Sequence, residues 1–393
     1  MASAPPILRP TDELPRDGQG RLLLKGLTQA ELERWLVEEM GERPFRATQI
    51  WKWLYIRLVS SFEEMTDLSK GLREKLMEVA RVDAITNDAV FRASDGTRKL
   101  TWKLDSGAVI ESVLIPSENR VTLCISSQVG CAMNCQFCLT AKMGLRGHLT
   151  TAEIVDQVAQ TRRMFESEGH ISNIVFMGMG EPLHNPDNVI PATQILIDRD
   201  GLGLSHRKVT VSTSGLVPEI KRLGEQSDAK LAVSLNATTD EMRDWLMPIN
   251  RKYPLAVLMQ TLREFPLRNG DRITLEYVML KDVNDSLEDA RRIVKLVEKV
   301  PCKVNLIPFN PHEGTEFQTS PRDRVEAFRT FLASKHVHTT IRETRGDDRM
   351  AACGQLGRPG EKMPKRMTPP AAIADRLGIG APLTASASDE SLS

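Results

Sequence analysis

An alternation of short apolar strands with helical patterns, running from Arg120 almost to the end of the chain, limits the folds that this sequence can adopt. The strand candidates are, in order, VTLCISS, NIVFMGMG, KVTVSTSG, KLAVSLNA, RITLEYVML, CKVNLIPFN and HTTIRE. Helical patterns lie between them, such as TAEIVDQVAQTRRMF, which Thr150 and Glu153 are spaced to cap. Repeated strand–helix units form parallel sheets, and six or more in series favour a complete or partial α/β barrel. Functional groups of such barrels gather at the carboxyl ends of the strands.

Three cysteines lie in one short loop after the first of these strands. Cys131, Cys135 and Cys138 form the run CAMNCQFC, with a spacing of three residues and then two. A tetrahedral zinc or an ordinary four-cysteine iron–sulfur cluster needs a fourth ligand. Three ligands on a cubane cluster leave one iron open to bind another molecule, which favours a cluster that does chemistry. The alternative is a zinc knuckle that takes its fourth ligand from a distant Cys or His.

Small and polar residues follow the next strands at the same predicted edge of the sheet. Gly180 and Glu181 follow the second strand, where glycine allows close backbone approach and a carboxylate can hold an ammonium group. Hydroxyl and amide groups, which suit a ribose or a carboxylate, follow later strands as Ser212–Gly215, Ser234–Asn236 and Asn310. One such residue alone is more often a turn or cap residue. Several at successive strand ends predict a ligand pocket that faces the cysteine loop.

Two smaller regions precede the barrel, which we expect over residues 119–360. Residues 21–85 contain the helical patterns AELERWLVEEMG, FRATQIWKWLYIRL and LSKGLREKLMEVA and predict a helical module. Residues 86–118 change to a period of two, with turn signals DG and SG, and predict an antiparallel meander. Residues 1–20 and 361–393 are polar or rich in small residues, and both predict disordered tails.

Composition excludes several classes of protein. With 52 basic and 52 acidic side chains, no net charge attracts the chain to nucleic acid, so such contacts require local patches. No stretch is apolar for long enough to cross a bilayer, and the start of the chain has no apolar leader. Six cysteines in 393 residues are too few for a disulfide scaffold, which favours a reducing cytoplasm.

These motifs together resemble a known family of enzymes. CxxxCxxC after the first strand of such a barrel, with Phe137 before the last cysteine, is the signature of the radical S-adenosylmethionine (SAM) superfamily. The longer runs VTLCISSQVGCAMNCQFC, NIVFMGMGEPLHN, VTVSTSG, SLNA, NLIPFNP and RGDDRMAACGQL resemble the RlmN family of bacterial methyltransferases. The resemblance covers about residues 25–360. It implies an α/β fold, a partial (β/α)6-type barrel with an N-terminal helical accessory domain that binds RNA and a small antiparallel β extension.

The resemblance implies a cofactor role for each matched position. Cys131, Cys135 and Cys138 would hold a [4Fe-4S] cluster, whose open iron takes the amino and carboxylate groups of SAM. The rest of the SAM pocket would consist of Gly180, Glu181, Ser212, Ser234, Leu235, Asn236 and Asn310. Phe137 would pack near the adenine of SAM or fill space beside the cluster.

Two further cysteines and a carboxylate complete the implied chemistry, in which C2 of an adenosine is methylated with two SAM molecules per turnover. The first SAM would methylate Cys353, and the second would be cleaved to a radical that activates this methyl group for addition to C2. Cys124 would then attack Cys353 and release the product, while Glu111 accepts the C2 proton. Without the resemblance, Cys124 and Cys353 are ordinary buried cysteines and Glu111 is a solvated strand carboxylate. Cys302 has no matched role.

The implied substrates are the peptidyl-transferase-centre adenosine of 23S rRNA and the adenosine beside the anticodon of some tRNAs. The implied protein is a cytoplasmic monomer that receives electrons from a flavodoxin or ferredoxin. Cations suited to RNA contact are Arg43, Arg46, Lys52 and Arg57, beside Trp51 and Trp53, and His206, Arg207, Lys208, Arg342 and Arg345 in the barrel. Three alternatives stay open: a Cfr-type enzyme that methylates C8 of the same adenosine, a radical SAM enzyme with an unrelated substrate, and a non-catalytic RNA-binding protein with a structural metal.

Overall fold

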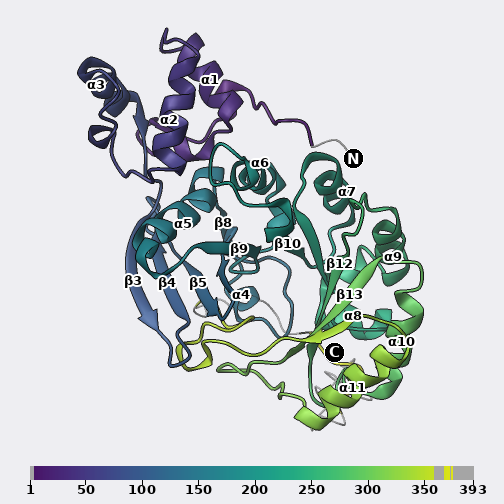
Figure 1. The fold of residues 1–393 in the computed structure, drawn as a ribbon. Helices are drawn as coiled ribbons and strands as arrows, with labels where there is room; N and C mark the ends of the chain where they lie inside the picture. Colours follow the sequence, from purple (N-terminus) through teal and green to yellow (C-terminus); the bar gives the residue numbers. More distant parts are fainter. Residues whose placement is uncertain (1–3, 358–366, 372, 375–393) are drawn as a thin grey trace, which may run out of the picture.

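The computed structural model describes residues 4–357, 367–371 and 373–374, in which ten strands form one continuous sheet (Figure 1). Their order is β14-β13-β12-β11-β10-β9-β6-β5-β4-β3, so neighbouring strands mostly follow one another in the sequence. The parallel part consists of β6 (Arg120–Cys124), β9 (Ile171–Phe176), β10 (Val209–Thr213), β11 (Lys230–Ser234), β12 (Ile273–Met279), β13 (Cys302–Pro308) and β14 (Thr339–Ile341). Each of the seven predicted strand runs therefore contains a strand, and the described pairing leaves the barrel open beyond β14.

Helices cover the outer face of the parallel strands and bury the apolar core (Figure 1). They are α5 (Thr151–Met164), α6 (Pro186–Ile197), α7 (Val217–Gln226), α9 (Leu255–Glu264), α10 (Leu287–Leu296) and α11 (Arg322–Ser334). The predicted capping box of α5 is present, since Thr150 accepts from the Glu153 backbone N–H and the Glu153 side chain accepts from Thr150. None of the described helices combines the length and the apolar character that a membrane span requires.

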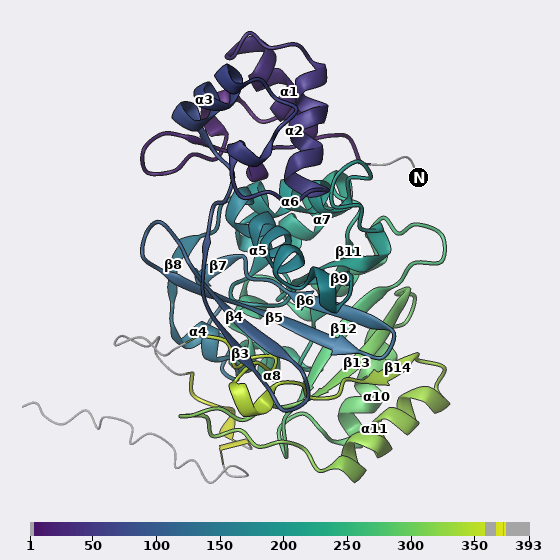
Figure 2. The same cartoon turned by 60° about the vertical axis from the view of Figure 1, so that its left-hand side comes forward.

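The predicted meander is present and continues the barrel sheet (Figure 2). It consists of β3 (Thr86–Arg92), β4 (Arg98–Lys103) and β5 (Val109–Ser117). Strand β5 pairs antiparallel with β6, where Val113 lies opposite Cys124. The meander therefore forms a wall beside the first barrel strand.

Three helices form a separate layer at the N-terminal end, beyond α5 and α6 (Figure 2). They are α1 (Gln29–Glu38), α2 (Phe45–Tyr55) and α3 (Lys70–Val79). The capping box that begins α1, Thr28 with Glu31, is present. Ile50, Trp51 and Leu54 of α2 are buried in one core with the barrel helices, so the layer is packed onto the barrel.

Residues 4–20, within the tail predicted to be disordered over residues 1–20, lie against the rest of the described chain. Arg9 forms an ion pair with the fully buried Glu31 at 2.7 Å and donates a hydrogen bond to Thr151. Leu14 is buried as well. The capping carboxylate of α1 thus also receives the Arg9 guanidinium, an interaction that composition does not reveal.

Most of the tail predicted over residues 361–393 lies outside the described residues. The described part packs beside the cysteine loop: the Trp245 indole N–H donates to the Met367 carbonyl, and the Met367 backbone N–H donates to Gln136 Oε1. Ile373 is buried in a cluster with Phe137 and Trp245. The described residues of this segment thus pack on the cluster, to which Ile373 supplies apolar surface.

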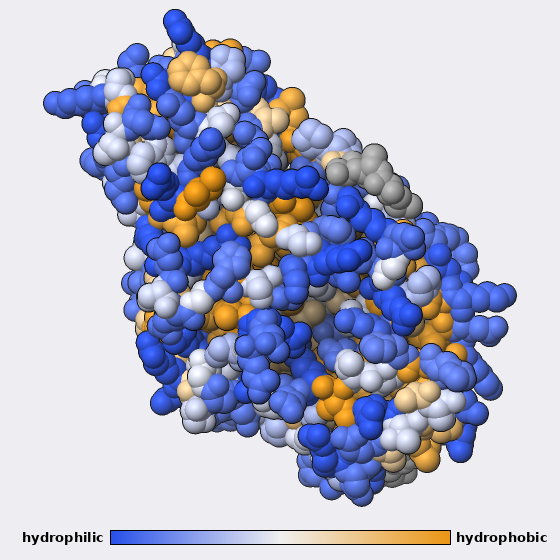
Figure 3. All heavy atoms as spheres, in the orientation of Figure 1, coloured by the Kyte–Doolittle hydropathy of each residue, from blue (hydrophilic) through white to orange (hydrophobic). Residues whose placement is uncertain are grey.

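The face seen in Figure 3 is mostly hydrophilic, with smaller apolar areas between, and it is hollowed near its centre. In the orientation of Figure 1 this hollow lies in the part of the molecule that the strands surround. The described residues keep most of their apolar side chains between sheet and helices and leave a recess inside the strands.

A buried ion pair between the helical layer and α5 generates a prediction about stability. Lys25 is 1% exposed and lies 2.6 Å from the buried Asp156 and 2.5 Å from Asp83. We expect Lys25→Ala to lower the free energy of unfolding, measured with urea, by about 3–5 kcal/mol, because it leaves a carboxylate buried without its cation. As a control, Lys70→Ala removes an exposed ion pair with Glu74. It should change the free energy of unfolding by less than about 0.5 kcal/mol. Equal effects of the two substitutions would contradict this assignment.

Candidate active site

A short hairpin that the sequence analysis missed holds the cysteine loop. Strand β7 (Gln128–Gly130) pairs antiparallel with β8 (Leu145–His148), and the loop runs between them. Gly130 has a φ of +76°, and a Cβ there would collide with the Gly144 carbonyl, to which the Cys131 N–H donates at 3.1 Å. The hairpin thus holds the two ends of the cysteine loop next to each other. Within the loop, the short helix α4 (Leu139–Lys142) follows Cys138.

The three loop cysteines line one cavity at the carboxyl ends of the strands. Burial raises the pKa of all three thiols. Backbone hydrogen bonds from Met133 to Cys131, and from Thr140 and Ala141 to Cys138, favour the thiolate forms instead. Buried thiols with such donors fit a cationic cluster, which deprotonates the thiols that bind it. No group of three or more His, Cys, Asp or Glu within the described ranges is placed to hold a single metal ion.

Gly180 and Glu181 lie at the next strand end, against the same hairpin. Gly180 has a φ of +108°, and a Cβ there would lie 2.6 Å from the Gln128 Cβ, so only glycine fits. The Glu181 N–H donates to Gln128 Oε1. The Glu181 carboxylate is buried and accepts from the backbone N–H groups of Leu183 (3.1 Å) and Ser214 (2.7 Å). Burial raises the pKa of Glu181, while these hydrogen bonds oppose the rise.

A fully buried arginine ties the following strand ends together. Arg243, on the short helix α8 (Asp240–Leu246), donates to the backbone carbonyls of Ser214, Ser234 and Leu235 at 2.7, 3.0 and 3.1 Å. Its remaining Nη1 donates to Asn250 Oδ1. Burial lowers the pKa of Arg243 to about 10, well above neutral pH, so the guanidinium stays charged. Electrostatic interaction with Cys135 raises the pKa of Arg243, so the guanidinium lies near the cysteine loop.

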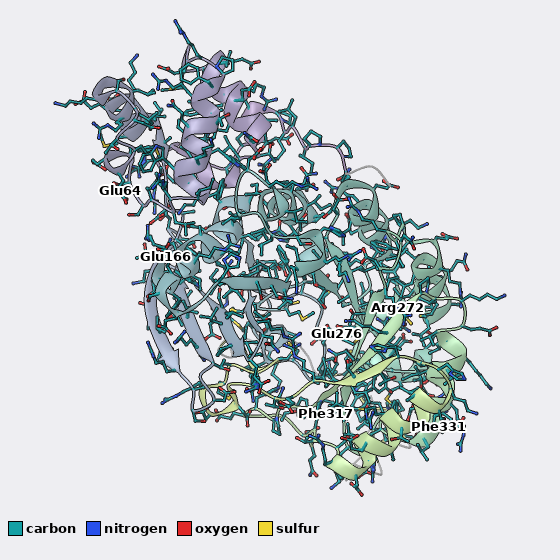
Figure 4. The ribbon with its side chains drawn as sticks, in the orientation of Figure 1. Glu64, Glu166, Arg272, Glu276, Phe317 and Phe331 are labelled. Carbon is teal, nitrogen blue, oxygen red and sulfur yellow. The ribbon has the colours of Figure 1, made fainter. Side chains whose placement is uncertain are left out.

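Ser212 and Glu276 form a polar pair on the inner face of the strands. The Ser212 hydroxyl donates to Glu276 Oε2 at 2.9 Å, and both residues line the cavity. Glu276 is only 5% exposed, and its Oε1 has no hydrogen-bond partner within the described residues. In Figure 4 it lies toward the centre of the space that the strands enclose. Oε1 lies 3.9 Å from the Arg342 guanidinium, too far for a hydrogen bond, so this oxygen can accept a hydrogen bond from a ligand in the cavity.

Cys353 reaches this cavity from a loop beyond the last strand. The Leu139 N–H donates to the Gly354 carbonyl at 2.8 Å, and Asn310 Nδ2 donates to the Cys353 carbonyl at 3.3 Å. Burial raises the pKa of Cys353 to about 11, and the nearby Arg342 guanidinium opposes this rise. Phe137 and Asn310 line the cavity with Cys353.

Cys124 and Glu111 lie on β6 and β5, behind the Cys353 loop. Burial raises the pKa of Cys124 to about 12, and electrostatic interaction with Cys353 adds to the rise, so the two thiols are near each other. Glu111 Oε2 accepts from the Gly357 N–H at 3.0 Å, and Oε1 lies 3.5 Å from the Lys99 ammonium. Glu111 therefore anchors the end of the loop that carries Cys353.

Family models match both parts of the chain. The model described as the ribosomal RNA large subunit methyltransferase N-terminal domain matches residues 23–82, and that of the radical SAM superfamily matches residues 125–297. The dual-specificity RNA methyltransferase RlmN of Geobacter sulfurreducens is 56% identical over 85% of this chain and 91% of its own length. The chain belongs to the RlmN family. RlmN 2 of Myxococcus xanthus is 51% identical over 89% of this chain and 95% of its own length.

A solved structure has the same overall fold as this RlmN-family chain. It is a radical SAM methyltransferase from Sphaerobacter thermophilus, 41% identical, with a TM-score of 0.81 over 85% of this chain and 98% of the other. The predicted family and the predicted fold, a radical SAM α/β fold with an N-terminal helical domain and a β extension, are thus confirmed.

The structure brings together most of the residues that the RlmN resemblance implied. Those lining the cavity are Cys131, Cys135, Cys138, Gly180, Glu181, Ser212, Ser234, Asn236, Asn310 and Cys353. Leu235 is not among the lining residues, because its side chain packs in the hydrophobic core and its carbonyl accepts from Arg243. Cys302, at the start of β13, is not among the lining residues.

Sequence reasoning missed Arg243, Glu276 and Gln128, three side chains that organise the site. Glu276 gave a usable signal, because a carboxylate inside the apolar strand ITLEYVM requires a buried partner. Arg243 gave none, since DEMRDWL is typical of an ordinary amphipathic helix with its charges in solvent.

The contacts of Arg243 generate a prediction about stability. We expect Arg243→Lys to lower the free energy of unfolding by about 3 kcal/mol, because an ammonium cannot reach the buried carbonyls that the guanidinium serves. Arg251→Lys, a nearby exposed position, should change it by less than about 0.5 kcal/mol. Urea unfolding of both variants measures the difference, and an Arg243→Lys protein as stable as the parent would refute the assigned role.

Proposed function

We propose that this chain methylates C2 of adenosine in 23S rRNA, at the peptidyl-transferase centre, and in tRNA, beside the anticodon. Membership of a family of dual-specificity RNA methyltransferases supports the activity class. The observation that carries the proposal is the presence of Cys353 in the cavity of the three loop cysteines, with Cys124 near it. A methyl group held on Cys353 would be adjacent to the centre that activates it.

Cofactor binding would use the strand ends. Cys131, Cys135 and Cys138 would hold a [4Fe-4S] cluster, which when bound supplies the electron that cleaves SAM. Gly180 and Glu181 would bind the amino acid part of SAM. Ser212, Ser234, Asn236 and Asn310, with the Leu235 backbone, would enclose the rest of SAM and exclude water from it.

Cys353 would carry the methyl group as S-methylcysteine. Its thiolate attacks the methyl carbon of a first SAM, a sulfur–carbon bond forms as the sulfonium bond breaks, and neutral S-adenosylhomocysteine leaves. A second SAM would be cleaved to methionine and 5′-deoxyadenosine, which takes one hydrogen atom from the S-methyl group. The methylene carbon then joins adenosine C2, and the adduct would return one electron to the cluster when the C2 proton leaves. Arg342 favours the thiolate, since it opposes the rise in the Cys353 pKa that burial causes.

Cys124 and Glu111 would complete the turnover. Glu111 would accept the proton that C2 loses, and movement of the loop that it anchors would free the carboxylate for this step. The Cys124 thiolate then attacks the Cys353 sulfur, a disulfide forms, and the carbon–sulfur bond to the adduct breaks. The methylene carbon keeps the electron pair and takes a proton, and an external thiol must reduce the disulfide before the next turnover.

The substrates and partners of this reaction follow from the same proposal. The helical layer of residues 21–85 would contact RNA, and an adenosine in a loop would be extruded to reach the cavity. A flavodoxin- or ferredoxin-type donor would supply electrons, and the chain would act as a cytoplasmic monomer.

The product itself tests the regiochemistry. We expect reconstituted enzyme with labelled SAM to yield 2-methyladenosine in rRNA and tRNA fragments, identified by nucleoside mass analysis against synthetic standards. Cys353→Ala should abolish the product, whereas Cys302→Ala, outside the cavity, should retain it. A product that comigrates with 8-methyladenosine would support the Cfr-type alternative, and full activity of Cys353→Ala would exclude the carrier mechanism.

Loss of the releasing thiol should trap an intermediate. We expect Cys124→Ala to accumulate a covalent adduct between protein and RNA that survives denaturing electrophoresis, because no thiolate remains to attack Cys353. Cys124→Ala/Cys353→Ala should form no adduct, since the attachment point is gone. An adduct in this double variant, or none in Cys124→Ala, would contradict the assigned roles.

A further inference from the structure

A second cavity continues from the active site down the inner face of the strands. Its volume is about 590 Å³, in the range of pockets that enclose small ligands. Cys353, Asn310 and Glu276 line both this cavity and the first, so the two meet at the methyl-carrying cysteine. Its walls are formed by residues of β5, β6, β9, β10, β12, β13 and β14, so it runs along the inner face of the sheet and reaches β14, beyond which the described strand pairing is open. We call it the lateral groove.

The walls of the lateral groove are polar where a barrel interior is usually packed with apolar side chains. Alternate residues of each strand face it, as the period of two requires, for example Lys303 and Asn305 on β13 and Thr274 and Glu276 on β12. Hydroxyl and amide groups from the other strands add to this lining: Thr122, Asn173, Thr210 and Thr340. The lining therefore offers hydrogen bonds to a polar ligand.

The charges of the groove do not balance. Two of its four cations are paired, Arg342 with Glu276 at 3.9 Å and Arg345 with Glu343 at 3.6 Å. Among the described residues no ion pair is formed by Arg120 or Lys303, the other two cations. Burial lowers the pKa of Lys303, the positive charges of Lys230 and Arg120 lower it further, and the negative charge of Glu276 opposes this fall. Two uncompensated cations in a polar groove create an anion site.

We propose that the lateral groove binds the RNA strand beside the target nucleotide, with Arg120 and Lys303 each contacting a phosphate. This inference rests on the proposed function and adds the substrate contacts to it. Phosphodiester groups are the anions that an RNA methyltransferase must hold, and the open edge lets a continuous strand enter from the side. With the strand in the groove, the target base lies at the end where Cys353 is shared with the first cavity.

RNA affinity at several salt concentrations tests the proposal, with full-length reconstituted protein and a labelled anticodon stem-loop RNA. We expect Arg120→Gln/Lys303→Gln to reduce the slope of log affinity against log salt by about 1.4, at 0.7 for each phosphate contact. At 0.1 M salt this variant should bind RNA about 25-fold more weakly than the parent. This factor is the slope change of about 1.4 taken over the tenfold range of salt from 1 M, where the two proteins should bind equally, down to 0.1 M. The charge-conserving Arg120→Lys/Lys303→Arg should keep the parental slope.

Two controls make the result specific. Lys221→Gln/Lys295→Gln removes two exposed cations from the outer helices α7 and α10 and should leave the slope unchanged. Methylation of Cys353 by SAM requires no RNA and should proceed normally in every variant. An unchanged slope in Arg120→Gln/Lys303→Gln would overturn the inference, as would loss of its Cys353 methylation or full competition by millimolar inorganic phosphate. If the parent protein binds RNA through these residues but yields no methyladenosine, the proposed function fails and the groove assignment stands.

Discussion

The arrangement of the site depends on the buried guanidinium of Arg243. Strand ends of a parallel sheet leave carbonyl groups that no neighbouring strand satisfies, and burial of such groups is costly. Arg243 donates to three of these carbonyls, on the segments that follow β10 and β11, and so keeps both segments close to the cysteine loop. Glu181 has the complementary role, because its carboxylate accepts backbone N–H groups from the ends of β9 and β10. The strand-end loops are thus held by a buried guanidinium on one side and by a nearly buried carboxylate at the cavity wall on the other.

The outer face of the parallel strands contributes to the stability of the fold, and the inner face carries the groups of the site. On the outer face, apolar side chains such as Leu231 and Val233 pack under the helices and supply the hydrophobic core. On the inner face, polar side chains such as Ser212 and Glu276 bond to one another and line cavities. Because successive residues of a strand point to opposite faces, a single strand serves both purposes. Glu276 accordingly lies between two fully buried apolar residues, Leu275 and Tyr277, that face the core.

Most of the fold and part of the site could be predicted from the sequence. Strand and helix positions followed from periodicity and capping, as at Thr150 and Glu153, because these signals are local. Interactions between distant segments were not predictable: Arg9 reaches Glu31 and Thr151, and the β7–β8 hairpin is too short for a clear period. Of the site, the strand-end position was predictable from the topology of α/β barrels. Cys353 was assigned to the site only by the family resemblance, because the place of its loop is fixed by single hydrogen bonds that no periodic pattern encodes.

That loop explains how a cysteine far along the chain reaches the cavity. Thr140 of α4 donates to the Leu356 carbonyl at 2.7 Å, Leu139 donates to Gly354, and Asn310 donates to Cys353 itself. Glu111 accepts from Gly357 and so links the same loop to the β extension. The loop is therefore held by the cysteine segment, by the end of β13 and by β5 at once. Any movement of the β extension against the barrel would shift Cys353 relative to the cavity, so the two parts must be positioned together for the cysteine to be in place.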